Sequence, residues 1–289
     1  MILGERIKEL VSLLEKRRTL IFHACQLRDF QTYLKVGGIP SRDFLVQKKQ
    51  VFTVFETDKN DQINGVLDKV FANLSDFGMT FANGGAGVPN PYGPILLQIN
   101  PIALLEASDV AICLRSAGAT NFNRQKEALK TNQDIDRIFL NSSDSAYPFS
   151  TYIKFKDKLQ EDFGYPNAHD PEISLSIESG MLSLEYVAFA KTDPYMIGRK
   201  SLRMLASEYI SSSKFAFSVK NRNCIDPKLY SELAQFAVNP KETLSKISQN
   251  EETSPSLKKW AKKAIGCDLE WQYERFAKYL REGTLQLFQ

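Results

Sequence analysis

The segment FHACQLRDFQTYLKVGGI, residues 22–39, predicts a strand that turns directly into a short helix. The apolar, partly β-branched run TLIF at residues 19–22 is typical of a buried strand. Asp29 is the expected N-cap of the helix, whose apolar residues then recur at i, i+3 and i+4. Gly37 and Gly38 are expected to end the helix, because glycine readily adopts the left-handed conformation that closes helices.

The composition is that of an ordinary soluble protein. The 289 residues are 43% hydrophobic and 25% charged, with a net charge of +3, and suffice for one large domain or for two. The four cysteines are scattered and there are only two histidines, so no metal-ligand spacing appears and no metal is expected. The cysteine usage, the charged N-terminus and the lack of an apolar run of about 20 residues predict a cytoplasmic protein with no membrane partner.

The chain changes character near residue 196. Strand patterns dominate before it, whereas the segments after it have helical periodicity and begin near Ser, Asp, Asn or Pro. The sequence therefore predicts an α/β (α+β) domain at residues 1–195 and an all-helical region at residues 196–289. In the first domain, helices are expected at residues 4–18, 29–36, 64–73 and 123–139, and strands at residues 19–22, 79–81, 95–99, 108–116, 171–177 and 183–192.

Familiar phosphate-binding and hydrolase motifs are absent. No GxxxxGK[ST] or GxSxG sequence occurs, and the glycine-rich residues 84–87 lack the strand and helix that flank a dinucleotide-binding loop. His23 and Cys25 are two positions apart, so they point to one face if both lie on a strand. A thiol–histidine hydrolase is one interpretation of this pair, and a buried, inert cysteine is the commoner one.

Three ordered segments carry a resemblance to a known family. Residues 22–42 resemble the N-terminal motif of DarT-like ADP-ribosyltransferases, H-x-T-x-x-x-N-L-x-x-I-L-x-x-G-L, which Ser-Arg often follows. The residues at these positions are His23, Cys25, Asp29, Phe30, Leu34, Gly38 and Ile39, with Ser41 and Arg42 after them. Cys25 stands where the family has Thr, and Asp29 stands where it has Asn.

The other two segments follow in the order of the family. Residues 74–81, LSDFGMTF, resemble a diverged L-x-D-Y-V-P-F-Y-F strand, with Phe81 where Tyr is usual. Residues 171–190, PEISLSIESGMLSLEYVAFA, resemble the C-terminal segment whose first Glu is catalytic, and Glu172 matches it. An isolated Glu is usually just an exposed carboxylate. The ordered set of motifs, which covers residues 19–192, is what favours a functional role.

The resemblance implies an ADP-ribosyltransferase-like split mixed sheet with flanking helices, and an enzyme that transfers ADP-ribose from NAD. Breaking the nicotinamide–ribose bond develops positive charge on the ribose, which a Glu172 carboxylate would offset. His23 would donate a hydrogen bond to the adenosine ribose, and Phe81 or Tyr92 would stack on nicotinamide. The implied NAD-contacting residues are His23, Cys25, Asp29, Gly38, Arg42, Phe81 and Tyr92.

The segment before Glu172 is expected to recognise the acceptor. Aromatic residues alternate there with lysines, which suits unstacked nucleotides because rings stack on bases and lysines meet phosphates. The candidate contacts are Tyr152, Lys154, Lys156, Lys158, Phe163 and Tyr165. In the family, the acceptor is a base in single-stranded DNA and the enzyme is the toxin of a toxin–antitoxin or anti-phage pair. Single-stranded RNA is also open as an acceptor.

Three further possibilities remain open at this point. The helical tail is a candidate surface for an antitoxin or chaperone. RNA 2′-phosphotransferases use NAD in a related fold, and such an enzyme would need basic residues converging on a phosphate. A catalytically inactive member that binds nucleic acid or protein is the non-enzymatic alternative.

Overall fold

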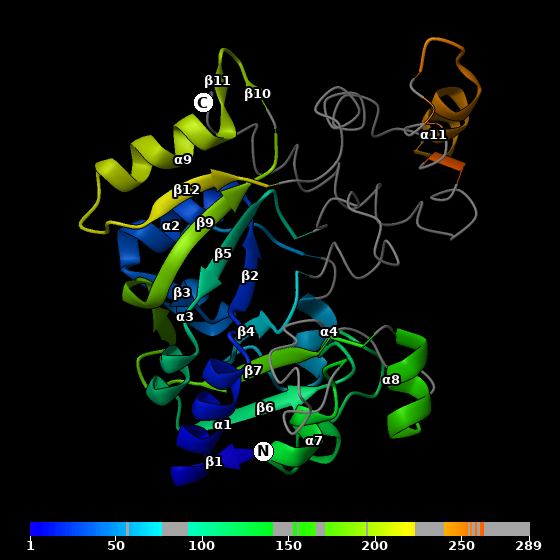
Figure 1. Ribbon diagram of the computed structural model, residues 1–289. Coiled ribbons are helices and arrows are strands. Elements are labelled where there is room, and N and C mark those ends of the chain that lie inside the picture. The colour runs from blue at the N-terminus through cyan, green and yellow to red at the C-terminus, as the bar shows by residue number, and fades with distance from the viewer. Residues whose placement is uncertain are drawn as a thin grey trace. The chain divides into compact units, whose positions relative to one another are not determined.

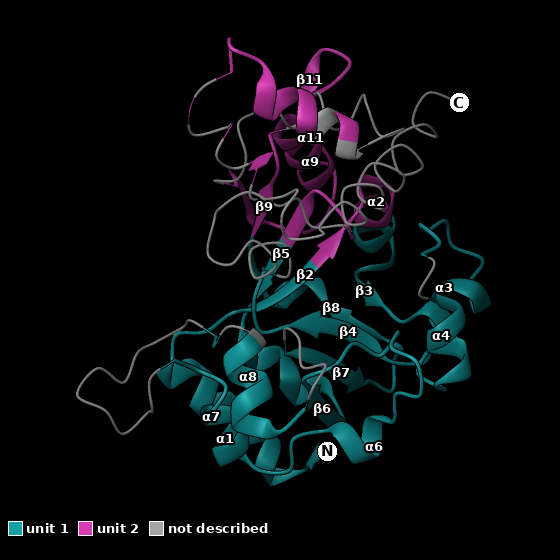
Figure 2. Ribbon diagram, turned by 90° about the vertical axis from the view of Figure 1, so that its right-hand side faces the viewer, with its two compact units in different colours: residues 1–23, 32–76, 97–189 teal, residues 24–31, 77–96, 190–289 magenta. Residues whose placement is uncertain are grey.

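The computed structural model describes residues 1–55, 58–76, 92–140, 153–154, 156–165, 171–194, 196–222 and 240–253, together with residues 255, 258 and 261–262. The chain divides into two units, each built from three separate stretches (Figure 2). Unit 1 comprises Met1–His23, Thr32–Asp76 and Leu97–Phe189, and unit 2 comprises Ala24–Gln31, Phe77–Leu96 and Ala190–Gln289. These limits differ from the expected boundary near residue 196, because strands from both sides of that residue join one sheet.

Eight strands form the main sheet, in the order β1-β6-β7-β4-β2-β5-β9-β12 (Figure 1). Their bounds are β1 Ile2–Leu3, β6 Asp109–Cys113, β7 Glu172–Ser176, β4 Val70–Asn73, β2 Ile21–Cys25, β5 Ile95–Ile99, β9 Val187–Thr192 and β12 Ser218–Asn221. Two small sheets pair β3 (Gly38–Pro40) with β8 (Met181–Ser183), and β10 (Met196–Ile197) with β11 (Lys200–Ser201). The expected α+β class, a large sheet with accompanying helices, is confirmed.

The helices are short, and α1 is the longest in the described part of the chain. Their bounds are α1 Glu5–Lys16, α2 Leu27–Val36, α3 Arg42–Gln47, α4 Asp58–Ile63, α6 Arg124–Glu127, α7 Asn132–Asp136, α8 Lys156–Phe163, α9 Leu202–Ser211 and α11 Pro240–Gln249, with 3-10 turns η1 Pro101–Glu106 and η2 Leu184–Tyr186. The predicted apolar face of α1 is confirmed, since Ile7, Leu10, Val11 and Leu14 are buried. Among the described helices, none is long and apolar enough to cross a bilayer.

Strand register in unit 1 places Glu172 in a row with residues of the neighbouring strands. β7 pairs antiparallel with both β4 and β6, so Glu172 lies opposite Asn73 on one side and Cys113 on the other. β4 pairs antiparallel with β2, with Phe22 opposite Asn73. Neighbouring strands are about 4.8 Å apart, so the backbones of Phe22 and Glu172 are separated by roughly 10 Å. β2 and β7, which carry His23 and Glu172, are thus two strands apart in one sheet.

The segment of residues 22–39 folds largely as its sequence predicts. β2 runs on to Cys25 instead of ending at residue 22. Asp29 is not the N-cap: it lies in the first turn of α2, where its carboxylate accepts the Gln26 N–H at 3.3 Å. This contact is the returning half of a capping box. The predicted glycine stop is confirmed, because Gly37 has a φ of 90° in the turn that ends α2.

Three sequence expectations are corrected by the structure. Residues 64–73, expected as a helix, form a turn and β4, and the helix of this region, α4, ends at Ile63. Residues 123–139 hold two short helices, α6 and α7, instead of one. In the described part, the region after residue 196 also contains strands β10, β11 and β12. Phe217 and Val219 alternate with smaller or polar residues in the manner of a strand. This short pattern was missed because the segments around it have helical periodicity and helix-capping residues.

Gly93 in unit 2 permits two backbone segments to meet. A Cβ atom at this position would overlap the Cys25 carbonyl group and lie only 2.6 Å from the Gln26 nitrogen. The φ of Gly93 is +154°, which residues with side chains rarely adopt. Glycine is therefore the residue that this contact requires.

We expect Gly93→Ala to destabilise the protein by about 3 kcal/mol, because the added methyl group must displace backbone instead of a flexible side chain. Gly65→Ala is the matched control, since Gly65 also has a positive φ, of 66°, but an added Cβ would meet nothing within 4 Å. The control should lose only about 1 kcal/mol. Urea unfolding followed by circular dichroism measures both. Equal losses in the two variants would contradict a close approach at Gly93.

Candidate functional site

The carboxyl group of Glu172, the first residue of β7, is held by the turn that follows β6. Its Oε1 accepts the Ala117 N–H at 2.7 Å, and its Oε2 lies 3.3 Å from the Ser116 hydroxyl. We call residues 116–119 the cradle turn. Strand pairing places this turn, because β6 ends at Cys113 directly opposite Glu172. The cradle turn therefore lies where the chain leaves the strand beside the carboxyl group.

The cradle turn is also held by apolar packing and by hydrogen bonds to its carbonyl groups. Ala117 is 2% exposed, and it belongs to an apolar cluster that includes Val66 and Phe122. Asn60 and Asn64, from α4 and the residue after its end, donate hydrogen bonds to the carbonyl groups of the turn. The sequence analysis did not single out these residues. The available signal was a run of small residues, SAGAT, directly after an apolar strand, which is typical of a tight turn.

Burial raises the pKa of Glu172 from its usual 4.5 to about 8. The Ala117 N–H and the Ser116 hydroxyl oppose this rise, and the nearby Asp61 carboxylate adds to it. Burial also raises the pKa of Asp61 to about 6, and that of the Cys113 thiol to about 12. Without a ligand, the Glu172 carboxyl is therefore largely protonated at neutral pH, and the neighbouring Cys113 is a neutral thiol.

His23 lies where β2 separates from β4. Its Nδ1 is 2.8 Å from the Phe71 carbonyl oxygen, and its Nε2 is 3.2 Å from the Tyr33 hydroxyl. The Leu74 N–H donates to the Pro171 carbonyl on the β7 side, and ladder bonds alternate sides, so the Phe71 carbonyl points toward β2. The imidazole therefore hydrogen-bonds to a carbonyl oxygen that, in a regular ladder, would accept from a backbone N–H of β2.

These contacts determine the tautomer of His23. A carbonyl group only accepts, so Nδ1 carries the proton and Nε2 accepts from the Tyr33 hydroxyl. Burial lowers the pKa of His23 to about 4; the Phe71 bond opposes this change and Arg42 adds to it. The ring is neutral at physiological pH. With this tautomer, His23 has no free N–H to donate to ribose, and its Nε2 would accept from a ribose hydroxyl only in place of the Tyr33 hydroxyl.

The structure argues against a thiol–histidine hydrolase. Cys25 is 1% exposed, and burial raises the pKa of its thiol well above the ordinary value, with Asp29 adding to the rise. The thiol is therefore protonated at neutral pH. Both ring nitrogens of His23 have hydrogen-bond partners other than Cys25. Cys25 fits the interpretation of a small, buried and inert residue.

The Arg42 side chain is held between two aromatic rings and a carboxylate. Its Cζ lies 5.1 Å from the ring centroid of Phe52 and 5.0 Å from that of Phe55. Its Nε lies 3.3 Å from Asp58 Oδ1. Stacking holds the guanidinium in place, and Asp58 offsets its charge. A phosphate at Arg42 would have to compete with that carboxylate.

The remaining predicted NAD contacts divide between the units. Gly38 belongs to unit 1, where a Cβ would come within 2.8 Å of a β8 carbonyl oxygen, so this glycine allows β3 to pair with β8. Cys25, Asp29 and Tyr92 belong to unit 2, in which Asp29 is buried and Tyr92 is half-buried. Phe81 lies outside the described residues. The structure thus places His23 and Glu172 on strands two apart in one sheet, with Arg42 close enough to His23 to act on its pKa.

The lysines expected to contact the acceptor have acidic partners. Lys154 Nζ lies 2.8 Å from Asp162 Oδ2. Lys158 Nζ lies 2.9 Å from Glu161 and 3.1 Å from Asp162. These carboxylates offset the lysine charges and so weaken the case for phosphate contacts at the two positions.

The other members of that set lie in or beside α8. Phe163 ends α8, and the Arg137 guanidinium lies 4.7 Å from its ring centroid. Tyr165 follows the helix and is half-buried. Tyr152 and the side chain of Lys156 lie outside what the structure describes. The expected aromatic and lysine interface therefore stays a prediction.

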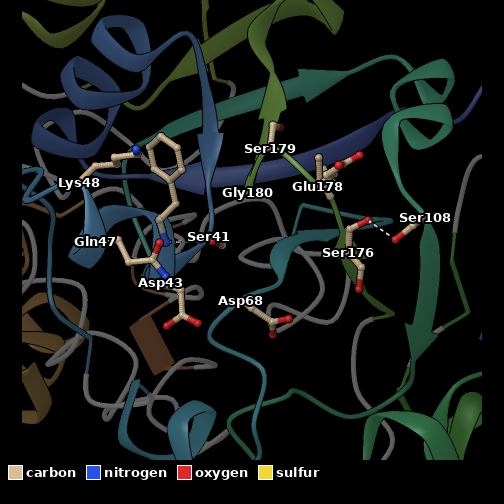
Figure 3. A pocket seen from close by; sticks show the side chains of 12 residues that line it. Ser41, Asp43, Gln47, Lys48, Asp68, Ser108, Ser176, Glu178, Ser179 and Gly180 are labelled. Carbon is tan, nitrogen blue, oxygen red and sulfur yellow. Dashed lines mark hydrogen bonds between the residues drawn. The ribbon is translucent and has the colours of Figure 1, made fainter.

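A cavity of about 630 Å³ opens at the other end of β7 from Glu172 (Figure 3). Its polar lining includes Ser41, Asp43, Lys48, Asp68, Ser108 and Glu178. Three carboxylates and one lysine line it, and Lys69 pairs with one of the carboxylates, Asp68, so a small excess of negative charge is left. That charge would repel the diphosphate of a dinucleotide. The cavity is therefore not the candidate NAD site.

Among solved structures, the chain is similar to Thermus sp. 2.9 DarT in complex with ADP-ribosylated ssDNA. The identity is 9% and the TM-score is 0.40, and the match covers 79% of this chain and 98% of that chain. No family model matches the sequence. No curated protein matches it either.

We expect Glu172→Gln to stabilise the protein increasingly as the pH rises. In wild type the unfolded carboxyl ionises near pH 4.5 while the folded one stays protonated to about pH 8, so folding stability is lost across this window. The neutral amide avoids the loss, and the variant should gain a few kcal/mol at pH 8 and little at pH 4.5. Urea unfolding at several pH values tests this. A difference independent of pH would show that Glu172 is ionised in the folded protein at neutral pH.

We expect His23→Asn to remove part of the acid sensitivity of the protein. In wild type the unfolded imidazole gains a proton near pH 6.5 and the folded one only near pH 4, so stability is lost as the pH falls through this window. Asn can still donate to the Phe71 carbonyl but does not titrate. Thermal melts at pH 4.5 and pH 7.5 should therefore differ less in the variant. An unchanged difference would mean that folded His23 is not held neutral.

Proposed function

We propose that the protein is an NAD-dependent ADP-ribosyltransferase that modifies a base in single-stranded nucleic acid. The observation that supports the proposal is that His23 and Glu172 lie on strands two apart in one sheet. Each matches a motif position of the DarT-like family. The buried carboxyl group is a candidate catalytic group, because strongly shifted pKa values beside specific partners are frequent at functional sites.

The described residues fit the ribose portions of NAD. Glu172 offers a carboxyl group that accepts from a ribose hydroxyl, and His23 Nε2 would accept from another ribose hydroxyl in place of the Tyr33 hydroxyl. Arg42 is the candidate partner for the diphosphate, provided that a phosphate competes with Asp58. Cys25, Asp29, Gly38, Phe81 and Tyr92 remain proposed contacts.

NAD would supply the ADP-ribosyl group and nicotinamide as the leaving group. The Glu172 carboxylate would accept a hydrogen bond from the ribose hydroxyl beside the reacting carbon, and would offset the positive charge that develops there. The positive nicotinamide ring would itself favour the ionised carboxyl. The Ala117 N–H would keep the carboxylate oriented throughout. His23 would hold the adenosine ribose through Nε2, with the ribose hydroxyl replacing that of Tyr33, and would stay neutral.

The test incubates the purified protein with NAD labelled in the adenine-linked phosphate. Separate reactions contain single-stranded DNA, single-stranded RNA of the same sequence, RNA ending in a 2′-phosphate, and a protein lysate. We expect label in DNA or RNA, with nicotinamide released in equal amount. Glu172→Gln should lower the rate at least about 100-fold. Glu178→Gln, a matched change at an exposed carboxylate beyond the far end of β7, should leave the rate unchanged.

The outcomes separate the alternatives. Label only in protein would overturn the nucleic-acid acceptor. Loss of the 2′-phosphate from RNA would identify the phosphotransferase instead. No nicotinamide release by wild type in any reaction would leave the inactive binding protein as the better account.

We expect kcat/KM for NAD to fall as the pH is lowered from 8 to 6. This parameter reports the ionisation of the free enzyme, whose Glu172 has a pKa of about 8. Initial rates at subsaturating NAD measure the profile. A profile that is flat over this range would exclude Glu172 as the group whose ionisation is required.

A further inference from the structure

Two asparagines hold the cradle turn through its carbonyl groups. Asn64 Nδ2 donates to the Ala117 carbonyl at 2.6 Å and to the Ala119 carbonyl at 3.1 Å. Asn60 Nδ2 donates to the Gly118 carbonyl at 2.7 Å. Three consecutive carbonyl groups of the turn are thus satisfied by two side chains from one short segment.

Ala117 is the point where the two sets of contacts meet. Its N–H donates to Glu172, its carbonyl accepts from Asn64, and its methyl group is buried in the apolar cluster. A residue held at its N–H, its carbonyl group and its side chain has little freedom to change φ and ψ. The position of the Ala117 N–H is therefore set by contacts that Glu172 itself does not make.

The same segment brings charge close to the carboxyl group. Asp61 lies between Asn60 and Asn64 in the sequence, and it raises the pKa of Glu172. Cys113 faces Glu172 from β6 as a neutral thiol, and the cradle turn contributes only neutral donors. Arg42 acts on Asp61 and opposes the rise of its pKa. The position of α4 thus affects both the hydrogen bonds and the electrostatics of Glu172.

We propose that Asn64, supported by Asn60, is a positioning residue for Glu172, and that it holds the cradle turn so that the Ala117 N–H and the Ser116 hydroxyl stay directed at the carboxyl group. The catalytic meaning of this inference rests on the proposed function. Its structural part rests on the hydrogen bonds alone. Supporting contacts of this kind matter because a misplacement of about 1 Å at a reacting group can cost roughly 100-fold in rate.

The first experiment follows Glu172 directly and needs no activity. The carboxyl carbon of Glu172 is observed by 13C NMR in protein labelled at glutamate Cδ, and the signal is assigned by its loss in Glu172→Gln. In Asn64→Ala the turn should loosen, so the titration midpoint of Glu172 should move by at least about one pH unit, downward where water enters or upward where the Ala117 bond is lost. Gln62→Ala removes an exposed amide from the same helix and should leave the midpoint unchanged.

The second experiment measures the reaction. Asn64→Ala should lower kcat roughly 10- to 100-fold with little change in KM, because the carboxyl is misplaced while most NAD contacts remain. Asn60→Ala, which removes one of the three bonds, should give a smaller effect of the same kind. It also serves as the test variant if Asn64→Ala fails to fold.

The results distinguish this inference from the proposed function. A wild-type protein without NAD cleavage would overturn the proposed function, while the NMR titration would still decide whether Asn64 controls Glu172. An active wild type whose Glu172 midpoint and kcat are unchanged by Asn64→Ala and Asn60→Ala would overturn the positioning role. A fall in kcat with an unchanged midpoint would also count against it, because the effect would then bypass the carboxyl group.

Discussion

The burial of one carboxyl group constrains the structure around the candidate site. Glu172 starts a strand that is paired on both sides, and its half-buried side chain meets the turn that follows β6. A buried carboxyl needs hydrogen-bond partners, and the Ala117 N–H supplies the shorter of its two bonds. That donor is available because the chain turns immediately after β6. The turn is in turn fixed by α4 and by the apolar cluster. Removing any of these contacts would expose the Glu172 carboxyl group to water or leave it without its hydrogen-bond donor.

His23, two strands away, provides a hydrogen bond where the pairing of β2 and β4 ends. Where β2 leaves β4, a carbonyl of β4 loses its expected partner, and the imidazole replaces the missing N–H. The cost of this arrangement is a ring that must stay neutral. His23 and Glu172 are therefore both uncharged between about pH 4 and pH 8, one because its pKa is lowered and the other because its pKa is raised. The folded state needs no compensating charge at either group in this window.

Local patterns of the sequence were informative where neighbours along the chain determine the outcome. The spacing of apolar residues correctly predicted α1, and the paired glycines correctly predicted the end of α2. Asp29 was predicted as the N-cap but lies in the first turn of α2. From there its carboxylate reaches back to the N–H of Gln26, the residue before the helix. The prediction of a helix at residues 64–73 was wrong. β4 has only four residues, too few for its alternation of buried and exposed side chains to be recognised in the sequence.

By itself, the sequence determined that an apolar strand leads up to His23, that a helix with a glycine stop follows, and that Glu172 begins a later strand. These features depend on residues within a few positions of one another. The tertiary structure alone decided that His23 bonds to Phe71, that Ala117 meets Glu172, and that Asn64 supports that contact. These partners are separated by some 50 residues along the chain, and only the pairing of strands brings them together. Protonation followed from the same step, because a pKa depends on burial and neighbours that exist only in the folded protein.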